Sequence, residues 1–117
     1  MRNSLFFQNN IIAGCATPLK YTASTTAPTG WTLTDLTNWF NTPANNNSIL
    51  PNCSDVKLTN AFDVSGTNSV DYTPMTGSPL LTGASFTNPK LASFTAVTYR
   101  GAVGAGDNWW KGWTSFK

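Results

Sequence analysis

The apolar residues near the start of the chain come in two short pieces, residues 5–7 and 11–13, with the polar run Gln8-Asn9-Asn10 between them. Each piece is too short for a helix, because a helix needs several turns to be stable. A strand, an asparagine-containing bend and a second strand are typical of one coil of a solenoid, in which polar side chains occupy the corner and Ile or Phe point inward. One coil cannot bury its own faces, so we expect a neighbouring coil or a cap on each side of it.

Ionisable residues are few and of few kinds. The 117 residues are 10% charged, with seven Lys and Arg, no His, and five acidic residues that are all aspartates. Without an imidazole base most familiar active sites cannot be assembled, and a serine nucleophile would lack its base. The basic residues are scattered instead of forming a stripe, so nucleic acid is not expected as a partner. We therefore predict that the chain is not an enzyme, with no catalytic residues and no cofactor.

The chain has two cysteines, Cys15 and Cys53. Without histidine they are too few for a four-ligand zinc site, so no metal site is expected. A Cys15–Cys53 disulfide would close a loop of about 39 residues, would stabilise the fold by about 4 kcal/mol, and would indicate an oxidising compartment. Two alternatives stay open. Both thiols could be free, or Cys15 could be lipidated, since Ile12-Ala13-Gly14-Cys15 resembles the motif at which bacterial lipoproteins are cleaved and acylated.

One short helix and several extended segments are expected within a single compact unit. Thr32 and Asp35 have the spacing of a helix-opening box, and apolar residues at helical spacing follow, so a helix is predicted for residues 34–40. The run at residues 45–47 is interpreted as a solvated asparagine turn. Extended segments or turns are predicted at residues 56–58, 61–62, 65–68, 78–84 and 94–99. A compact chain of this length would have a radius of gyration of about 13 Å and would bury about two-thirds of its unfolded surface.

The acidic residues are interpreted as structural. Asp55, Asp63 and Asp71 are evenly spaced, but no calcium-loop motif is present, and even spacing alone does not make the carboxylate pair of a glycosidase. We interpret them as solvated turn residues. Arg100 is expected to stack on an aromatic ring or to pair with Asp107.

The C-terminal tail combines turn-forming glycines with large rings. These rings could cover the open end of a solenoid. Alternatively, Trp110 and Trp113 could stack on the apolar faces of sugars while Asp107 binds the hydroxyls. Because Trp109 and Trp110 are adjacent and should face different ways, Trp110 is expected to be the exposed ring.

Several motifs of the C-terminal half occur together. They are Gly77-Ser78-Pro79-Leu80-Leu81, Gly83-Ala84-Ser85-Phe86, Tyr99-Arg100-Gly101-Ala102-Val103-Gly104, Asn108-Trp109 and Gly112-Trp113-Thr114. This set resembles the terminal segment of secreted right-handed parallel β-helix proteins of Bacteroidota type, in which the segment follows the last coils and often precedes a type IX secretion sorting domain. Residues 5–14 are similar to one of those last coils.

The resemblance implies an all-β fold: the last coils of a right-handed parallel β-helix, with a short helix and an aromatic C-terminal cap. Residues 1–76 would form the coils with a loop and the helix, and residues 77–117 the cap. It also implies export to the cell surface or the extracellular space, but no activity. No sorting domain is recognised after Lys117 and few coils precede the cap, so we expect a C-terminal piece of a longer protein.

Three functions are compatible with these features. The leading hypothesis is a noncatalytic structural or interaction module that terminates a β-solenoid, with its first coil covered by another protein chain or by upstream coils. The second is a carbohydrate-binding module that uses Asp107, Trp110 and Trp113 to bind glycans. The third is the C-terminal fragment of a polysaccharide lyase or hydrolase whose catalytic coils lie elsewhere.

Overall fold

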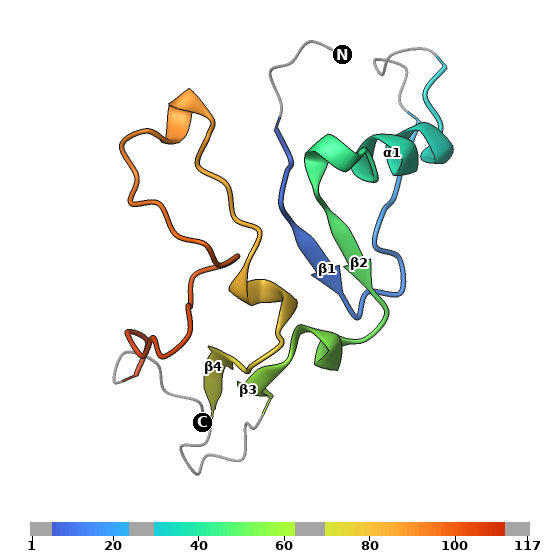
Figure 1. Ribbon diagram of the computed structural model, residues 1–117. Coiled ribbons are helices and arrows are strands. Elements are labelled where there is room, and N and C mark those ends of the chain that lie inside the picture. The colour runs from blue at the N-terminus through green and yellow to red at the C-terminus, as the bar shows by residue number, and fades with distance from the viewer. Residues whose placement is uncertain (1–5, 24–29, 63–69, 112–117) are drawn as a thin grey trace.

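The computed structural model describes residues 6–23, 30–62 and 70–111 of the chain. Within these ranges one α-helix and four short strands are joined by long irregular segments, as can be followed in Figure 1. In chain order these elements are β1 Ile11–Ala13, α1 Leu33–Phe40, β2 Ser48–Leu50, β3 Leu58–Asn60 and β4 Asp71–Pro74. Four 3₁₀ helices add single turns at Pro43–Asn45, Cys53–Val56, Pro79–Leu81 and Pro89–Leu91.

The strands form two separate two-stranded sheets. β1 and β2 are parallel, with Ile12 opposite Ile49, and β3 and β4 are antiparallel, with Asn60 opposite Asp71. The parallel pair is the one part of the described chain that has the arrangement of two adjacent coils. The described residues do not form a solenoid, and most of them are irregular.

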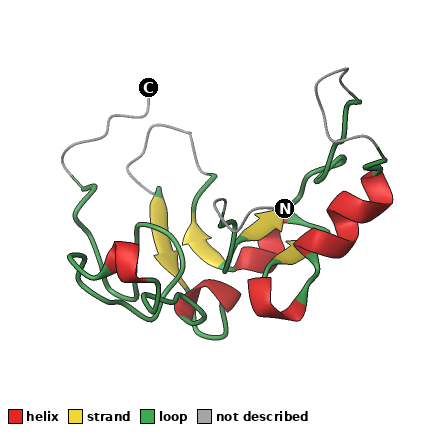
Figure 2. Ribbon diagram, turned by 90° about the horizontal axis from the view of Figure 1, so that it is seen from above, coloured by secondary structure: helices red, strands yellow, loops and turns green. Residues whose placement is uncertain are grey.

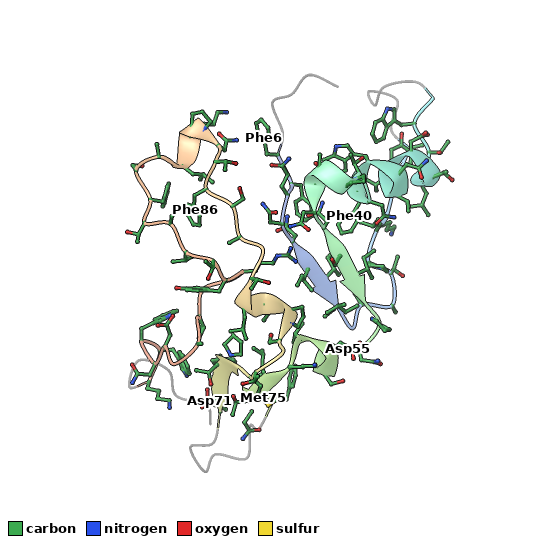
Figure 3. The ribbon with its side chains drawn as sticks, in the orientation of Figure 1. Phe6, Phe40, Asp55, Asp71, Met75 and Phe86 are labelled. Atoms are coloured by element: carbon green, nitrogen blue, oxygen red, sulfur yellow. The ribbon has the colours of Figure 1, made fainter. Side chains whose placement is uncertain are left out.

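Helix α1 forms where the sequence predicts it, because its signals are local. Thr32 Oγ1 accepts a hydrogen bond from Asp35 N, and the Asp35 carboxylate accepts one from Thr32 N in return. This reciprocal box satisfies two N–H groups that the helix leaves without a partner. At the other end Phe40 is completely buried, and its ring centroid lies 6.1 Å from that of Phe7 (Figure 3).

Two predicted extended segments differ from the structure. Residues 78–84 contain the 3₁₀ helix Pro79–Leu81, because proline fixes φ near the helical value and the Ser78 hydroxyl accepts a hydrogen bond from Leu80 N. Residues 94–99 form no strand. β3 begins at Leu58, the last of the predicted residues 56–58, because Lys57 adopts a left-handed φ of 52° where the preceding 3₁₀ helix ends. The predicted turn at residues 65–68 lies outside the described residues.

The molecule is more open than a compact chain of its length. Its radius of gyration is 17.3 Å and its accessible surface is 8579 Å², whereas a compact chain of this mass would have about 13 Å and about 6,200 Å². Seen from above, the elements lie in a row instead of in layers around one centre (Figure 2). Among the described hydrophobic residues, Phe40 and Trp110 are the buried ones. The two-thirds burial expected from the length is therefore not reached.

Candidate functional site

Four asparagines join the bend before β1 to the bend before β2, and we call them the asparagine corner: Asn9, Asn10, Asn46 and Asn47. Asn9 and Asn46 both adopt a left-handed backbone, with φ of 62° and 49°. Asparagine tolerates this conformation better than most residues. The Asn46 side-chain amide donates to Asn9 Oδ1 over 2.9 Å. Two bends of the same shape therefore lie side by side, 37 residues apart in the chain.

Asn47 is the most extensively bonded side chain of the asparagine corner. Its Oδ1 accepts hydrogen bonds from the backbone N and the Nδ2 of Asn10, over 2.9 and 3.2 Å. Its Nδ2 donates to Phe7 O over 2.8 Å and to Phe40 O over 3.2 Å. The amide thus ties the first bend to the end of α1. The interpretation of residues 45–47 as a solvated turn is wrong for Asn47, whose amide bonds within the protein.

Trp110, predicted to be the exposed ring of a sugar platform, is buried. It is 4% exposed, and its ring meets the edge of Tyr72 at a centroid distance of 5.7 Å. Its neighbour Trp109 is 58% exposed and its Nε1 donates to Ala102 O over 2.9 Å. The two rings do face different ways, but their roles are reversed because Tyr72 on β4 provides an apolar surface for Trp110. Trp113 lies outside the described residues.

Asp107 stabilises the loop to which it belongs. Its Oδ2 accepts a hydrogen bond of 2.6 Å from Gly104 N. Burial raises the pKa of Tyr99, and the negative charge of Asp107 and a hydrogen bond to it raise that pKa further. Arg100 makes no ion pair with Asp107 among the contacts of the described residues. Its guanidinium lies instead against Gly83 and donates to Asn46 O over 3.5 Å.

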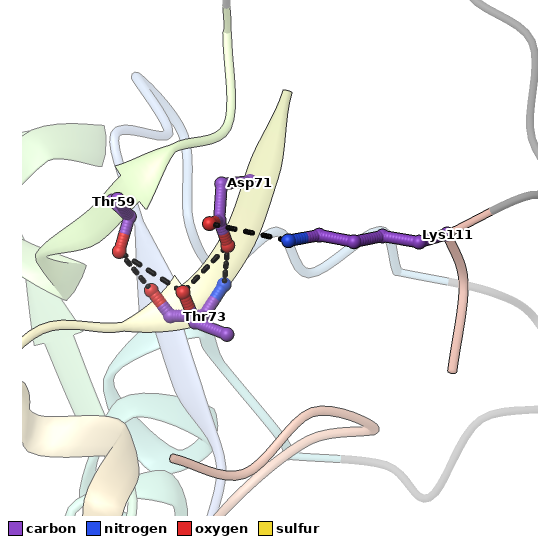
Figure 4. A network of polar contacts seen from close by, with 4 residues as sticks. All are labelled: Thr59, Asp71, Thr73 and Lys111. Carbon is purple, nitrogen blue, oxygen red and sulfur yellow. Dashed lines mark hydrogen bonds and ion pairs between the residues drawn. The ribbon is translucent and has the colours of Figure 1, made fainter. Parts of the chain in front are cut away.

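Asp71 lies at the centre of a polar network on β4 (Figure 4). Its Oδ1 accepts hydrogen bonds from Thr73 N and Thr73 Oγ1, over 2.9 and 2.5 Å, and Lys111 Nζ lies 4.0 Å from Oδ2. Hydrogen bonds from the Thr73 hydroxyl and then from its backbone N–H, with a smaller contribution from Lys111, lower the pKa of Asp71. Thr73 also contacts Thr59 on β3 through their hydroxyls, which are 3.0 Å apart. The network links the two strands of the antiparallel pair, so Asp71 is a partly buried strand residue and not the solvated turn residue that the sequence predicted. Asp63 lies outside the described residues.

Both cysteines are free and exposed, so the predicted disulfide is not formed in this structure. Cys53 Sγ nevertheless lies over the backbone of Ala13 and Gly14, immediately before Cys15, at 3.9 Å from Ala13 O. Within the described part of the chain, no three His, Cys, Asp or Glu side chains are placed together to hold a metal ion.

Described residues line two open hollows on the surface. The first, of about 590 Å³, is beside the β3–β4 pair and is lined in part by Leu58, Phe62 and Met75. Figure 3 labels Met75 near Asp71, beside that pair. The second, of about 230 Å³, separates the bend at Asn9 from the segment around Phe86. Neither hollow is lined by a carboxylate. The paired carboxylates of a glycosidase are therefore missing from both, whereas Tyr99 and Arg100 line the second.

Comparisons of the chain with protein-family models, with curated proteins and with solved structures found no match. No helix in the described ranges is long and apolar enough to span a membrane. The site that the geometry defines best is thus the asparagine corner. The sequence signal that could have revealed it is the recurrence of an asparagine run before an isoleucine-containing segment, at residues 9–12 and again at residues 46–49.

Proposed function

We propose that the chain is a noncatalytic structural module that ends a right-handed parallel β-solenoid outside the cell or on its surface. The observation that carries the proposal is the asparagine corner together with the parallel pair that follows it. The bend at Asn9 and strand β1 recur 37 residues later as the bend at Asn46 and strand β2, in the same register. Parallel neighbours need a long crossover between them, and stacked coils with matching corners are how a solenoid meets that need. The resemblance of residues 77–116 to β-helix endings supports the terminal position and the export.

A partner is part of this proposal. Two-stranded sheets are marginal by themselves in water, and among the described residues no further strand pairs with the outer edge of β1 or of β2. Large apolar side chains are exposed over the described surface, Phe62 and Phe94 by 70% and 63%. Exposed rings, beside only two buried hydrophobic residues in the described part of the chain, support an interaction surface. Another protein chain, or further coils of the same protein, would cover it.

The direct test of the solenoid is to add a coil. A second copy of residues 8–44, inserted before Gln8, would supply one more bend and one more strand to pair with β1. We expect the free energy of unfolding to rise by about 2 kcal/mol, because each added repeat contributes an interface and the new corner amides contribute about 1 kcal/mol each. The measurement is urea unfolding of the two proteins.

The matched control carries the same insertion with alanine in place of both corner asparagines of the added copy. It has the same length and composition elsewhere, but it cannot extend the corner, so we expect it to be less stable than the full insertion. A full insertion that is no more stable than the original chain, or than this control, would argue against stacked coils.

The noncatalytic part of the proposal is tested by incubating the purified chain with a panel of neutral and acidic polysaccharides. We expect no new reducing ends and no unsaturated products, because the chain has no histidine and neither hollow is lined by a carboxylate. Cleavage of any polysaccharide would instead favour the fragment of a lyase or hydrolase.

Carbohydrate binding is the second candidate, and one observation favours it. The Trp109 ring is 58% exposed while its Nε1 is held by Ala102 O, so a flat apolar face is presented in a fixed orientation. Sugars that stack on it should change the tryptophan fluorescence, and Trp109→Ala should abolish the change while Trp110→Phe preserves it. Silence on a glycan array, together with unchanged fluorescence, would remove this candidate.

A further inference from the structure

The smaller hollow, of about 230 Å³, lies between distant parts of the chain. One wall is the bend at Gln8 and Asn9, and the other is formed by the segments around Phe86 and Arg100. In Figure 1 these walls belong to the blue segment before β1 and to the orange part of the chain that faces it. Pockets for drug-sized ligands measure roughly 300–1,000 Å³. This hollow therefore suits a smaller ligand, of about the size of one sugar ring.

Hydrogen bonds hold both walls in place. On the first wall, Asn9 N donates to Asn45 O over 2.8 Å, and the side-chain amide of Asn46 donates to Asn9 Oδ1 over 2.9 Å. On the second wall, Ala84 N donates to Thr98 O over 3.1 Å. The hollow is thus formed without a ligand, which lowers the cost of ordering the protein when a ligand binds.

The side chain of Arg100 has a defined place in the second wall. Its backbone N donates to Leu80 O over 2.7 Å. A Cβ at Gly83 would lie only 2.6 Å from Arg100 Nε, so glycine at that position leaves room for the guanidinium. Arg100 Nη2 donates to Asn46 O over 3.5 Å. The guanidinium therefore extends from the second wall to the asparagine corner.

The positive charge of Arg100 is not balanced by any carboxylate among the described residues. Its Nε is buried without a hydrogen-bond partner, and the contact of Nη2 is at the long limit for a hydrogen bond. Within the described ranges the one ion pair joins Lys111 to Asp71. The aspartates of these ranges accept hydrogen bonds from their own caps, turns or strands: Asp35, Asp55, Asp71 and Asp107. An anion bound in the hollow would balance the charge, which is delocalised over the whole guanidinium.

Two amides on the first wall offer hydrogen-bonding groups to a ligand. Gln8 Nε2 donates weakly to Ala44 O, over 3.4 Å, while its Oε1 accepts no hydrogen bond from a described residue. Asn9 Oδ1 accepts from Asn46, while its Nδ2 donates to no described residue. One amide thus offers an acceptor and the other a donor, the pair that sugar hydroxyl groups require.

Aromatic rings complete the lining. Phe86 and Tyr99 both contact the hollow, and Phe86 is labelled in Figure 3. The apolar C–H face of a sugar can stack on such rings. A guanidinium, two amides and two rings around a small volume together match a sugar that carries a carboxylate. A simple carboxylate would leave the amides unused, and a neutral sugar would leave the arginine unpaired.

We propose that this hollow binds one acidic sugar unit, with its carboxylate on the guanidinium of Arg100 and its hydroxyl groups on the amides of Gln8 and Asn9. The planar fork of arginine can bond both oxygens of a carboxylate. Trp109 does not line the hollow, so the site differs from the exposed tryptophan face. It requires only the two walls, and it stands whether or not the chain ends a solenoid.

The test is an NMR titration of the full ¹⁵N-labelled chain with glucuronate, glucose and acetate. Glucuronate should shift the backbone amide signals of Ala84, Ser85 and Gly101, with a Kd of about 1 mM, as expected for a ligand with so few atoms. Glucose lacks the carboxylate and acetate lacks the ring, so each should bind at least about tenfold more weakly. Glucuronate binding no tighter than that of either compound would overturn the proposal, as would shifts confined to the Trp109 indole.

A pair of variants tests the role of Arg100. Arg100→Met keeps the aliphatic stem and removes the charge, so the Kd for glucuronate should rise at least about tenfold. Lys111→Met is the matched control, because it removes the same charge from a residue that does not line the hollow; its Kd should stay within about twofold of the original. Unchanged binding by Arg100→Met, or equal weakening in both variants, would overturn the proposal.

The ¹⁵N spectrum of each variant shows whether it folds. If Arg100→Met does not fold, Arg100→Lys keeps the charge but loses the planar fork, and it should still weaken glucuronate binding several-fold. Full-strength binding by Arg100→Lys would overturn the forked contact. Methyl glucuronide identifies the source of the ligand: binding equal to that of free glucuronate supports a unit within an acidic glycan, and binding of free glucuronate alone supports a free sugar acid in the same site.

Discussion

Single side chains of this protein make hydrogen bonds that join segments far apart in the sequence. The amide of Asn47 makes four hydrogen bonds that join two bends and a helix end. Each hydrogen bond contributes about 1 kcal/mol net to stability. The hydrogen bonds of this one amide therefore stabilise the fold about as much as burial of a medium-sized apolar side chain. In the described part of the chain, where few rings are buried, polar side chains therefore contribute much of the stability. Asp71 on β4 shows how such a side chain makes stability depend on pH.

Acid should weaken the protein through Asp71. Because its folded-state pKa is lowered, the ionised carboxylate stabilises the native state above its unfolded pKa of about 3.9, and this stabilisation is lost as the pH falls through the folded value. Melting temperatures measured from pH 7 downward should be lower for Asp71→Asn than for the original chain near neutrality. The two should converge in strong acid.

Two further variants rank the causes of that lowered pKa. Thr73→Val removes the hydroxyl that contributes most, and Lys111→Met removes the more distant charge, which contributes least. We expect the loss of stability in acid to move to higher pH in Thr73→Val more than in Lys111→Met. The opposite order would mean that charge attraction, and not hydrogen bonding, controls the carboxylate.

At the scale of elements, the sequence predicts structure that depends on neighbouring residues and misses structure that depends on contacts between residues far apart in the chain. α1 was predicted within one residue of its start because its cap is encoded three residues apart. β2 was not predicted, since Ser48–Leu50 is a strand only through pairing with β1. The same applies to the site: Trp110 is buried by Tyr72, and Arg100 lies beside Gly83, contacts that no local pattern contains.

The contribution of the α1 N-cap to stability can be tested with two threonine-to-alanine variants. Thr32→Ala removes the side chain that accepts from Asp35 N and donates to the Asp35 carboxylate. We expect a loss of about 1 kcal/mol in the free energy of unfolding, the usual cost of deleting a threonine N-cap. Thr34→Ala, in the first turn of the same helix and exposed, should change stability by less than about 0.5 kcal/mol. Equal effects would show that the cap contributes nothing beyond helix propensity.

At the scale of the whole molecule, little surface is removed from water. A fully extended chain of 12.6 kDa exposes about 18,300 Å², so the 8579 Å² that remain in the folded state correspond to burial of about 53%, against about 65% for a typical chain of this length. The deficit, about 2,400 Å² relative to a compact chain, has the size of a substantial protein–protein interface. A solenoid end that is completed by a neighbour would have a deficit of this kind.

The openness of the molecule predicts a small heat-capacity change on unfolding. Because this quantity scales with the surface exposed, we expect about four-fifths of the typical value, or about 1.3 instead of about 1.6 kcal/mol/K for 117 residues. Calorimetry at several pH values gives the heat-capacity change as the slope of the unfolding enthalpy against the melting temperature. The urea m-value should be reduced in the same proportion. The measurement must be made where light scattering shows a monomer, because association buries further apolar surface. A monomer with the full typical value would contradict the open arrangement, and with it the proposal that a partner covers this chain.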